Sequence, residues 1–163
     1  MTITLQSGGR VPDVLLGKLD DGHVVTHSLS RLIADRRALI FGVPGAFTPI
    51  CTERHAAQFV ADADGLKRSG FDVILCIAPD NPWAVDAWAR QLDPKGKLCF
   101  LSDSLGRFGA ATGLKMRNEE LLLGNILRRF VMTANDGVIG HLGIEPDGVS
   151  LTCSGPDAVL CAA

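Results

Sequence analysis

Three uninterrupted apolar runs constrain the fold of this chain more than any other feature. They cover residues 38–43, 73–78 and 98–101, and runs without polar alternation are typical of strands that are covered on both faces. Helices are predicted between them, because apolar residues recur there at helical spacing and Asn81-Pro82 is a good helix start. Strands that alternate with helices predict an α/β fold with parallel pairing. The apolar helix faces consist of Ala56, Phe59, Val60, Ala63 and Leu66, and of Ala84, Val85, Trp88 and Leu92.

Two turn signals predict antiparallel hairpins at the two ends of the chain. Asp20-Asp21-Gly22 separates residues 14–19 from 23–28, and Asn135-Asp136-Gly137 separates residues 130–133 from 138–142. We therefore expect an α/β architecture, a mixed sheet flanked by helices with an N-terminal hairpin and a C-terminal β-hairpin.

The remaining segments complete a single predicted domain over residues 1–163. Residues 29–35 and 156–161 are predicted to form short helices, and residues 1–10 to form a loose N-terminal arm. A chain of this length can bury about 70% of its unfolded surface in one domain.

The composition is that of an ordinary globular protein. The chain has 16 Lys+Arg against 18 Asp+Glu, a formal net charge of -2, and 47% apolar residues. This balance gives no electrostatic reason to expect nucleic-acid binding, and no apolar stretch approaches the ~20 residues of a membrane span.

The five cysteines do not form a disulfide framework or a zinc motif. Their number is odd, and no C-x-x-C pair, zinc spacing or signal peptide accompanies them. We therefore expect a reduced, cytoplasmic compartment with free thiols. The cysteines are Cys51, Cys76, Cys99, Cys153 and Cys161.

One cysteine lies where a helix is expected to begin. Thr48 is a good N-cap and Pro49 a good first helical residue, which places Cys51 at the third helical position. Unpaired N–H groups and the helix dipole favour a thiolate there. Lowering a thiol pKa by about two units takes roughly 2.7 kcal/mol, whereas an exposed helix terminus supplies about 0.3–1 kcal/mol. A cation is therefore required, and His55 and Arg129 are the candidates.

Each of these residues also has a plain structural interpretation. Cys51 could be a small buried hydrophobic residue. His55 could bond the backbone or water from a helix face, which is its favoured interpretation, and Arg129 could be a solvated charge on a strand edge. Similarly, Cys99 is expected in the core, and Trp83 and Trp88 are expected to pack their helix.

The segment Pro44-Gly45-Ala46-Phe47-Thr48-Pro49-Ile50-Cys51, followed by His55, resembles the active-site loop of the peroxiredoxins, specifically the atypical peroxiredoxin-5 or type II branch. The resemblance covers about residues 11–163. Further matching stretches are Arg128-Arg129-Phe130, Asp136-Gly137, Glu145-Pro146-Asp147-Gly148 and Leu151-Thr152-Cys153.

This resemblance implies a thioredoxin-like fold and a thiol-dependent peroxidase. Cys51 matches the peroxidatic cysteine, Thr48 the hydroxyl that binds the peroxide, Pro44 the residue that shields the pocket, and Arg129 the arginine that polarises the peroxide. The substrates would be hydrogen peroxide or organic hydroperoxides. Thioredoxin, glutaredoxin or glutathione would supply electrons, without a cofactor or metal, and the protein would form a homodimer.

The resolving thiol stays open at this point. Cys153 matches the resolving position of animal-type members and lies in a polar stretch, whereas Cys76 matches a second cysteine of plant-type members but lies within an apolar run. Cys161 or an external thiol could also compete. The segment 78–81, Ala-Pro-Asp-Asn, and Ile50 depart from the common family pattern.

Three other functions are less well supported by the residues. A disulfide oxidoreductase would need a cysteine at position 54, which is Arg54. A Cys–His hydrolase would use Cys51 and His55 without depending on Arg129. A redox-sensing interaction module would react with peroxide without turnover.

Overall fold

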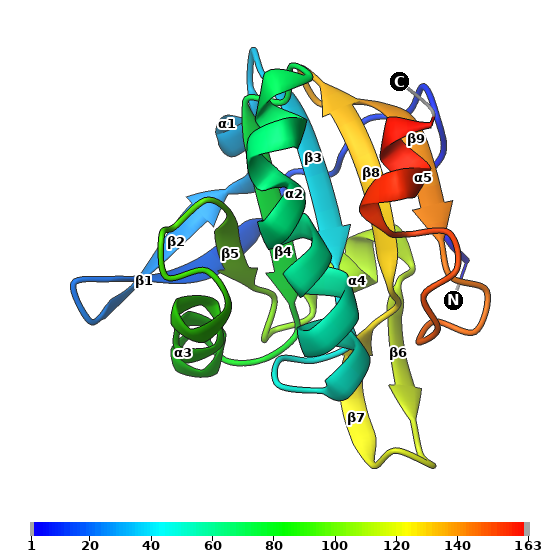
Figure 1. Ribbon diagram of the computed structural model, residues 1–163. Helices are drawn as coiled ribbons and strands as arrows, with labels where there is room; N and C mark the ends of the chain where they lie inside the picture. Colours follow the sequence, from blue (N-terminus) through cyan, green and yellow to red (C-terminus); the bar gives the residue numbers. More distant parts are fainter. Residues whose placement is uncertain (1, 162–163) are drawn as a thin grey trace.

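A computed structural model describes residues 2–161, and its centre is a seven-stranded mixed sheet (Figure 1). The strand order is β2-β1-β5-β4-β3-β8-β9, and a separate two-stranded sheet pairs β6 with β7. The strands are β1 (Leu15–Asp20), β2 (His23–Ser28), β3 (Arg37–Gly42), β4 (Val73–Ala78), β5 (Cys99–Ser102), β6 (Lys115–Asn118), β7 (Leu123–Leu127), β8 (Phe130–Asn135) and β9 (Val138–Ile144). The helices are α1 (Leu29–Ile33), the π-helical turn η1 (Ile50–Ala56), α2 (Ala57–Arg68), α3 (Pro82–Leu92), α4 (Arg107–Thr112) and α5 (Pro156–Leu160).

The strand pairing confirms the predicted mixed sheet. The apolar runs form β3, β4 and β5, which pair in parallel. Both predicted hairpins are present, with β1 pairing antiparallel to β2 and β8 pairing antiparallel to β9. The helix α3 also begins as expected, because the Asn81 side chain accepts from the backbone N–H of Ala84.

Alternate residues of each central strand enter two separate apolar clusters. In β3, Leu39 and Phe41 face the cluster that contains α2, α3 and α5, whereas Ala38 and Ile40 face the cluster that contains α1 and α4. Helices therefore cover both faces of the sheet (Figure 1).

Residues 2–10 correct the prediction of a loose arm. Thr4 N–H donates to the carbonyl of Thr112, Gly8 N–H donates to the carbonyl of Ile139, and Arg10 forms a β-bridge with Val138. Leu5 is buried in the core. The arm is held because it adds backbone hydrogen bonds beside β9, which hydropathy along the chain does not reveal.

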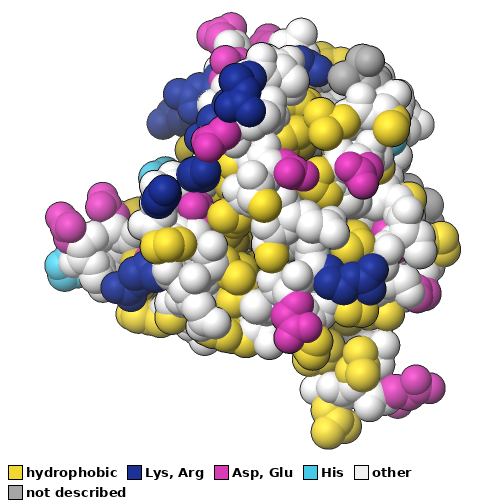
Figure 2. Space-filling model, viewed as in Figure 1, with side chains coloured by type: hydrophobic (Ala, Val, Ile, Leu, Met, Phe, Trp, Pro, Cys, Tyr) yellow, Lys and Arg dark blue, Asp and Glu magenta, His cyan; other side chains and the backbone are white. Residues whose placement is uncertain are grey.

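The hairpin of β6 and β7 was not predicted. It extends beyond the main sheet, at the lower edge of Figures 1 and 2. Leu121 and Leu122 lie exposed in its turn.

The two tryptophans of α3 differ in burial. Trp83 is 59% exposed, which contradicts the expected helix packing, whereas Trp88 is fully buried as predicted.

Across the described residues 2–161, no helix combines the length and apolar character that a membrane crossing requires.

Candidate active site

The segment between β3 and η1 forms a tightly held loop at the carboxyl end of β3. Val43 N–H donates to the carbonyl of Ile77, and Ala46 N–H donates to the Asp80 carboxylate at 2.7 Å. Phe47 has a left-handed φ of 62°, which bulky residues rarely adopt, and it turns the chain toward the helix. Burial raises the pKa of Asp80, although its bond from Ala46 opposes this effect.

The helix that carries Cys51 starts differently from the prediction. Its first turn is a π-helix whose N-cap residue is Pro49, so Cys51 is its second residue rather than its third. Thr48 does not cap this turn with its side chain. Its hydroxyl instead donates to the carbonyl of Gly45 at 2.8 Å, while its backbone carbonyl accepts from Thr52. The Thr-Pro pair therefore shapes the preceding loop.

Sheet register places Arg129 beside this turn. Gly42 at the end of β3 pairs with Phe130 at the start of β8, so Arg129 lies level with the first residues of the loop. Its Nη2 donates to Cys51 Sγ at 3.3 Å. Both side chains are buried, each with 1% exposure, which contradicts the interpretation of Arg129 as a solvated charge.

The buried guanidinium has no carboxylate partner among the described residues. Its Nε donates to the Val149 carbonyl at 3.0 Å, and its Nη1 lies 3.0 Å from His55 Nδ1. No ion pair within residues 2–161 includes Arg129. A buried cation without an anion is costly, so the arrangement favours negative charge on the Cys51 sulfur.

His55, the other candidate cation, is not the cation that contacts Cys51, and its favoured interpretation as a residue that bonds the backbone is confirmed. Its Nε2 lies 2.8 Å from the carbonyl of Ser154. Burial, and then the charge of Arg129, lower the pKa of His55 to about 3. The imidazole is therefore neutral near pH 7, and Arg129 is the cation that contacts Cys51.

A mostly apolar pocket lies beside these residues, with Arg129 in its wall. Its volume is about 250 Å³. It combines residues of the loop with leucines of the β6–β7 hairpin, which the sequence analysis did not connect with the site. The lining residues are Pro44, Thr48, Pro49, Ile50, Leu121, Leu123, Arg129 and Val149.

The comparisons with known proteins agree with this geometry. The Redoxin family model matches residues 6–160. The chain is 35% identical over 156 residues to peroxiredoxin-2C of Oryza sativa subsp. japonica, covering 95% of this chain and 96% of that protein. It is also 35% identical over 161 residues to the chloroplastic peroxiredoxin-2E of Arabidopsis thaliana, covering 96% of this chain and 69% of that protein. The chain belongs to the peroxiredoxins.

Solved structures support the same assignment. Reduced Prx3 from Vibrio vulnificus, in a crystal structure with H₂O₂, superimposes with a TM-score of 0.90 at 29% identity, covering 98% of this chain and 99% of that chain. Peroxiredoxin 5 from Alvinella pompejana has a TM-score of 0.78 at 29% identity, covering 89% and 92% of the two chains. The thioredoxin-like fold is confirmed, and this peroxiredoxin is a thiol-dependent peroxidase.

The two candidate resolving cysteines of this peroxiredoxin lie in different environments. Cys76 is fully buried in the middle of β4, and burial raises its pKa well above the ordinary range. Cys153 is half-buried in the segment after β9, where burial and the charge of Glu145 raise the pKa of its thiol. Cys161 is exposed after α5, and Cys99 is partly buried.

The Glu145 carboxylate holds the segment around Cys153 in place, a role that was not predicted from the sequence. Glu145 is fully buried, and its oxygens accept hydrogen bonds from Thr152, Cys153 and Ser154. Burial alone would raise the pKa of Glu145, but these hydrogen bonds outweigh it and lower the pKa to about 2. Only its place in the resembling Glu145-Pro146-Asp147-Gly148 stretch could have drawn attention to it.

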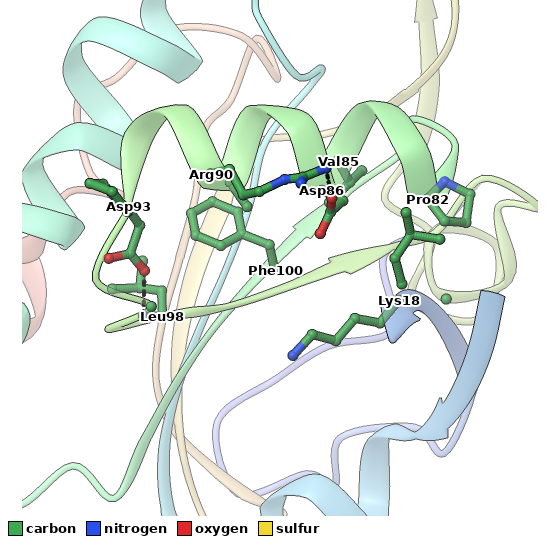
Figure 3. Close-up of a pocket in the computed structure, with 13 residues that line it drawn as sticks. Lys18, Pro82, Val85, Asp86, Arg90, Asp93, Leu98 and Phe100 are labelled. Carbon is green, nitrogen blue, oxygen red and sulfur yellow. Dashed lines mark hydrogen bonds and ion pairs between the residues drawn. The ribbon is translucent and has the colours of Figure 1, made fainter. Parts of the chain in front are cut away.

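A second hollow, of about 230 Å³, lies between α3 and the strands β1 and β5 (Figure 3). Three of its charged groups already have partners, because Arg90 pairs with Asp86 and the Asp93 carboxylate accepts from the backbone N–H of Leu98. It contains none of the residues around Cys51. Within residues 2–161, no cluster of three or more His, Cys, Asp or Glu side chains could hold a metal ion.

Proposed function

We propose that Cys51 is the peroxidatic nucleophile and that Arg129 stabilises both its thiolate and the developing negative charge on the peroxide. The observation that carries this proposal is the 3.3 Å contact between Arg129 Nη2 and Cys51 Sγ, made by a buried guanidinium without a carboxylate partner in the described chain. Electrostatic stabilisation by a fixed donor is strong in such a water-poor site.

The peroxide-reducing step needs only protein side chains and a peroxide, and a dithiol donor then restores the reduced enzyme. The thiolate attacks one oxygen of R–O–O–H, the S–O bond forms, and the O–O bond breaks with its electron pair leaving on RO⁻. This alkoxide takes a proton from solvent, and Cys51 becomes a sulfenic acid. A thiol then attacks the sulfenic sulfur, which gives a disulfide and water.

The loop residues position the peroxide in this proposal. The Thr48 hydroxyl donates its proton to the Gly45 carbonyl, so its oxygen remains available to accept from a peroxide O–H. Pro44, which is buried and lines the pocket, shields the reacting atoms from water. Such fixed alignment favours in-line attack.

The pocket favours organic hydroperoxides over hydrogen peroxide. Leu121, Leu123 and Val149 line it together with Ile50, and these side chains offer contact to an alkyl group but no polar partner. Burying apolar surface of the substrate contributes about 25 cal/mol per Å². A hydroperoxide with a bulky apolar substituent should therefore bind better than hydrogen peroxide.

We assign resolution to Cys153, and electron donation to a thioredoxin-type dithiol protein, with glutaredoxin or glutathione as alternative donors. Cys153 is more accessible than Cys76, and it is flanked by Thr152 and Ser154, the residues held by Glu145. A homodimer in the cytoplasm completes the proposal. The exposed apolar side chains Leu15 and Leu105 support a subunit interface.

The role of Arg129 is tested by Arg129→Ala. We expect the second-order rate constant for peroxide reduction to fall by about 10²-fold or more, as loss of one oxyanion donor can cause. The control is Arg54→Ala, which removes an exposed cation from the same helical turn as Cys51. Equal rates in the two variants would contradict the assignment.

The substrate preference is tested by Leu123→Asn. We expect the ratio of the rate constants for cumene hydroperoxide and hydrogen peroxide to fall about 5- to 10-fold, because apolar contact is lost from the pocket wall. Leu122→Asn is the matched control, since Leu122 is 90% exposed and does not line the pocket. The preference for organic hydroperoxides would be refuted by an unchanged ratio in Leu123→Asn.

A further inference from the structure

A continuous hydrogen-bonded chain runs behind the reacting sulfur. Arg129 contacts Cys51 through Nη2 and His55 through Nη1, and His55 contacts the carbonyl of Ser154 through Nε2. Ser154 is in turn bound by Glu145, whose Oε1 accepts from both its N–H and its hydroxyl. All five residues of this chain, Cys51, His55, Arg129, Glu145 and Ser154, are at most 1% exposed.

The partners on its two sides determine the state of the His55 ring. A guanidinium can only donate, so Nδ1 must accept from Arg129, and a carbonyl can only accept, so Nε2 must carry the proton toward Ser154. A protonated ring would place an N–H against the N–H of Arg129. The neutral ring with its proton on Nε2 is therefore the form that satisfies both contacts.

Packing leaves this ring little freedom to turn. Phe41 and Phe59 meet it edge-on, with ring centroids 5.1 Å and 5.4 Å from that of His55. The charged groups that face it are Arg129, which lowers its pKa, and Glu145, which opposes that effect. The ring therefore gives the Arg129 side chain a fixed hydrogen-bond acceptor. This bond helps to offset the rotamer entropy that a long side chain loses when it is ordered.

We propose that His55 is a positioning residue for peroxide reduction: its neutral imidazole fixes the Arg129 guanidinium in line with Cys51, and the Ser154 carbonyl selects the required tautomer. The inference rests on the proposed role of Arg129. His55 touches neither substrate nor the reacting sulfur, so it acts on the reaction through Arg129. Glu145 completes the arrangement by fixing Ser154.

The pair His55→Asn and His55→Leu separates the acceptor from the bulk of the ring. The two replacements have similar shapes, but only Asn places an oxygen near the position of Nδ1. We expect His55→Leu to lower the rate constant for peroxide about 10-fold, the effect of losing one hydrogen bond to a charged group. His55→Asn should recover most of this loss, and the alkylation rate of Cys51 by iodoacetamide should follow the same order.

A double-mutant cycle tests whether His55 acts through Arg129. In the Arg129→Ala background, we expect His55→Leu to have little further effect on the peroxide rate constant. The same 10-fold loss in both backgrounds, or equal losses in His55→Asn and His55→Leu, would overturn the positioning role. An unchanged rate in Arg129→Ala alone would instead refute the proposed function, so the two failures are distinguishable.

The wild-type protein provides a test that does not depend on the folding of variants. In ¹⁵N-histidine spectra, the His55 ring should remain a neutral Nε2–H tautomer from pH 5 to pH 8, in accordance with its pKa of about 3. A ring that titrates in this interval, or that carries its proton on Nδ1, would overturn the proposal.

Discussion

Cys51 and Cys76 lie in the same apolar cluster and are both buried, yet only Cys51 is in hydrogen-bond contact with a charged group. Cys51 receives a hydrogen bond from the Arg129 guanidinium. Cys76, in the middle of β4, has no hydrogen-bond partner for its sulfur among the described residues, and burial raises its pKa well above the ordinary range.

This difference shows that burial alone does not make a cysteine reactive. Desolvation disfavours the thiolate, which is the nucleophilic form. In the proposed function, the directional cation at contact distance offsets that cost for Cys51, whereas Cys76 has no such contact. The comparison extends to His55, another buried titratable group in contact with Arg129, whose pKa is lowered so that its ring is neutral near pH 7.

The largest effect is expected from removing the two sulfurs in turn. Cys51→Ser should abolish peroxide consumption, because no other described thiol accepts a hydrogen bond from a guanidinium. Cys76→Ser, which makes the same atomic change in the same cluster, should retain the peroxide reaction within a few-fold. Stopped-flow tryptophan fluorescence and peroxide consumption measure both. Retained turnover in Cys51→Ser would show that Cys51 is not the nucleophile that reacts with the peroxide.

A second prediction concerns the thiol that reacts with oxidised Cys51. After one equivalent of peroxide we expect a Cys51–Cys153 disulfide, because Cys153 is half-buried whereas Cys76 is fixed within a strand. Peptide mapping of the oxidised protein identifies the pair, and Cys153→Ser should lower turnover with a dithiol donor more than the first peroxide reaction. A map that contains only Cys51–Cys76 would show that strand burial does not protect Cys76, and one that contains only a mixed disulfide would assign resolution to an external thiol instead of Cys153.

The framework of the fold could be predicted because its signals are local. The apolar runs became β3, β4 and β5, and the turn residues Asp136-Gly137 joined β8 to β9. The arm formed by residues 2–10 was missed because its bonds reach partners more than a hundred residues away, such as Ile139. The β6–β7 hairpin was missed because β6 spans only Lys115–Asn118 and contains a single apolar residue, Met116, which is too little for a periodic signal.

The site could be predicted in its main parts but not in its charge state. Resemblance identified Arg129 as a partner of Cys51, and the structure brings the two together. It was not possible to foresee that His55 would be neutral, because that depends on its burial and on the guanidinium beside it. The helix start at Thr48 was also misplaced, because a π-helical turn follows from tertiary packing rather than from capping residues.

The smallest effect is a pH dependence of stability that reports on His55. Its pKa is lowered from 6.5 to about 3 in the folded protein, so the unfolded chain binds this proton more readily. The stability contributed by the neutral ring is fully present above pH 6.5 and is lost progressively as the pH falls toward 3. One such proton changes the free energy of unfolding by about 1.4 kcal/mol per pH unit.

Urea unfolding between pH 6.5 and pH 4.5 reports this contribution as the difference in slope between wild type and a variant without the ring, because the raised pKa values of Asp80 and Asp103 also affect the wild-type slope in this interval. The depressed Glu145 carboxyl destabilises the fold only below its ordinary pKa of 4.5. We expect His55→Asn to flatten the slope in this interval by about one proton, whereas His23→Asn, the same change at an exposed histidine of β2, should leave it unchanged. Equal slopes in wild type and His55→Asn would mean that the ring is protonated in the folded state. Two positive charges, on Arg129 and on His55, would then lie side by side near Cys51. The argument that Arg129 keeps His55 neutral would be contradicted.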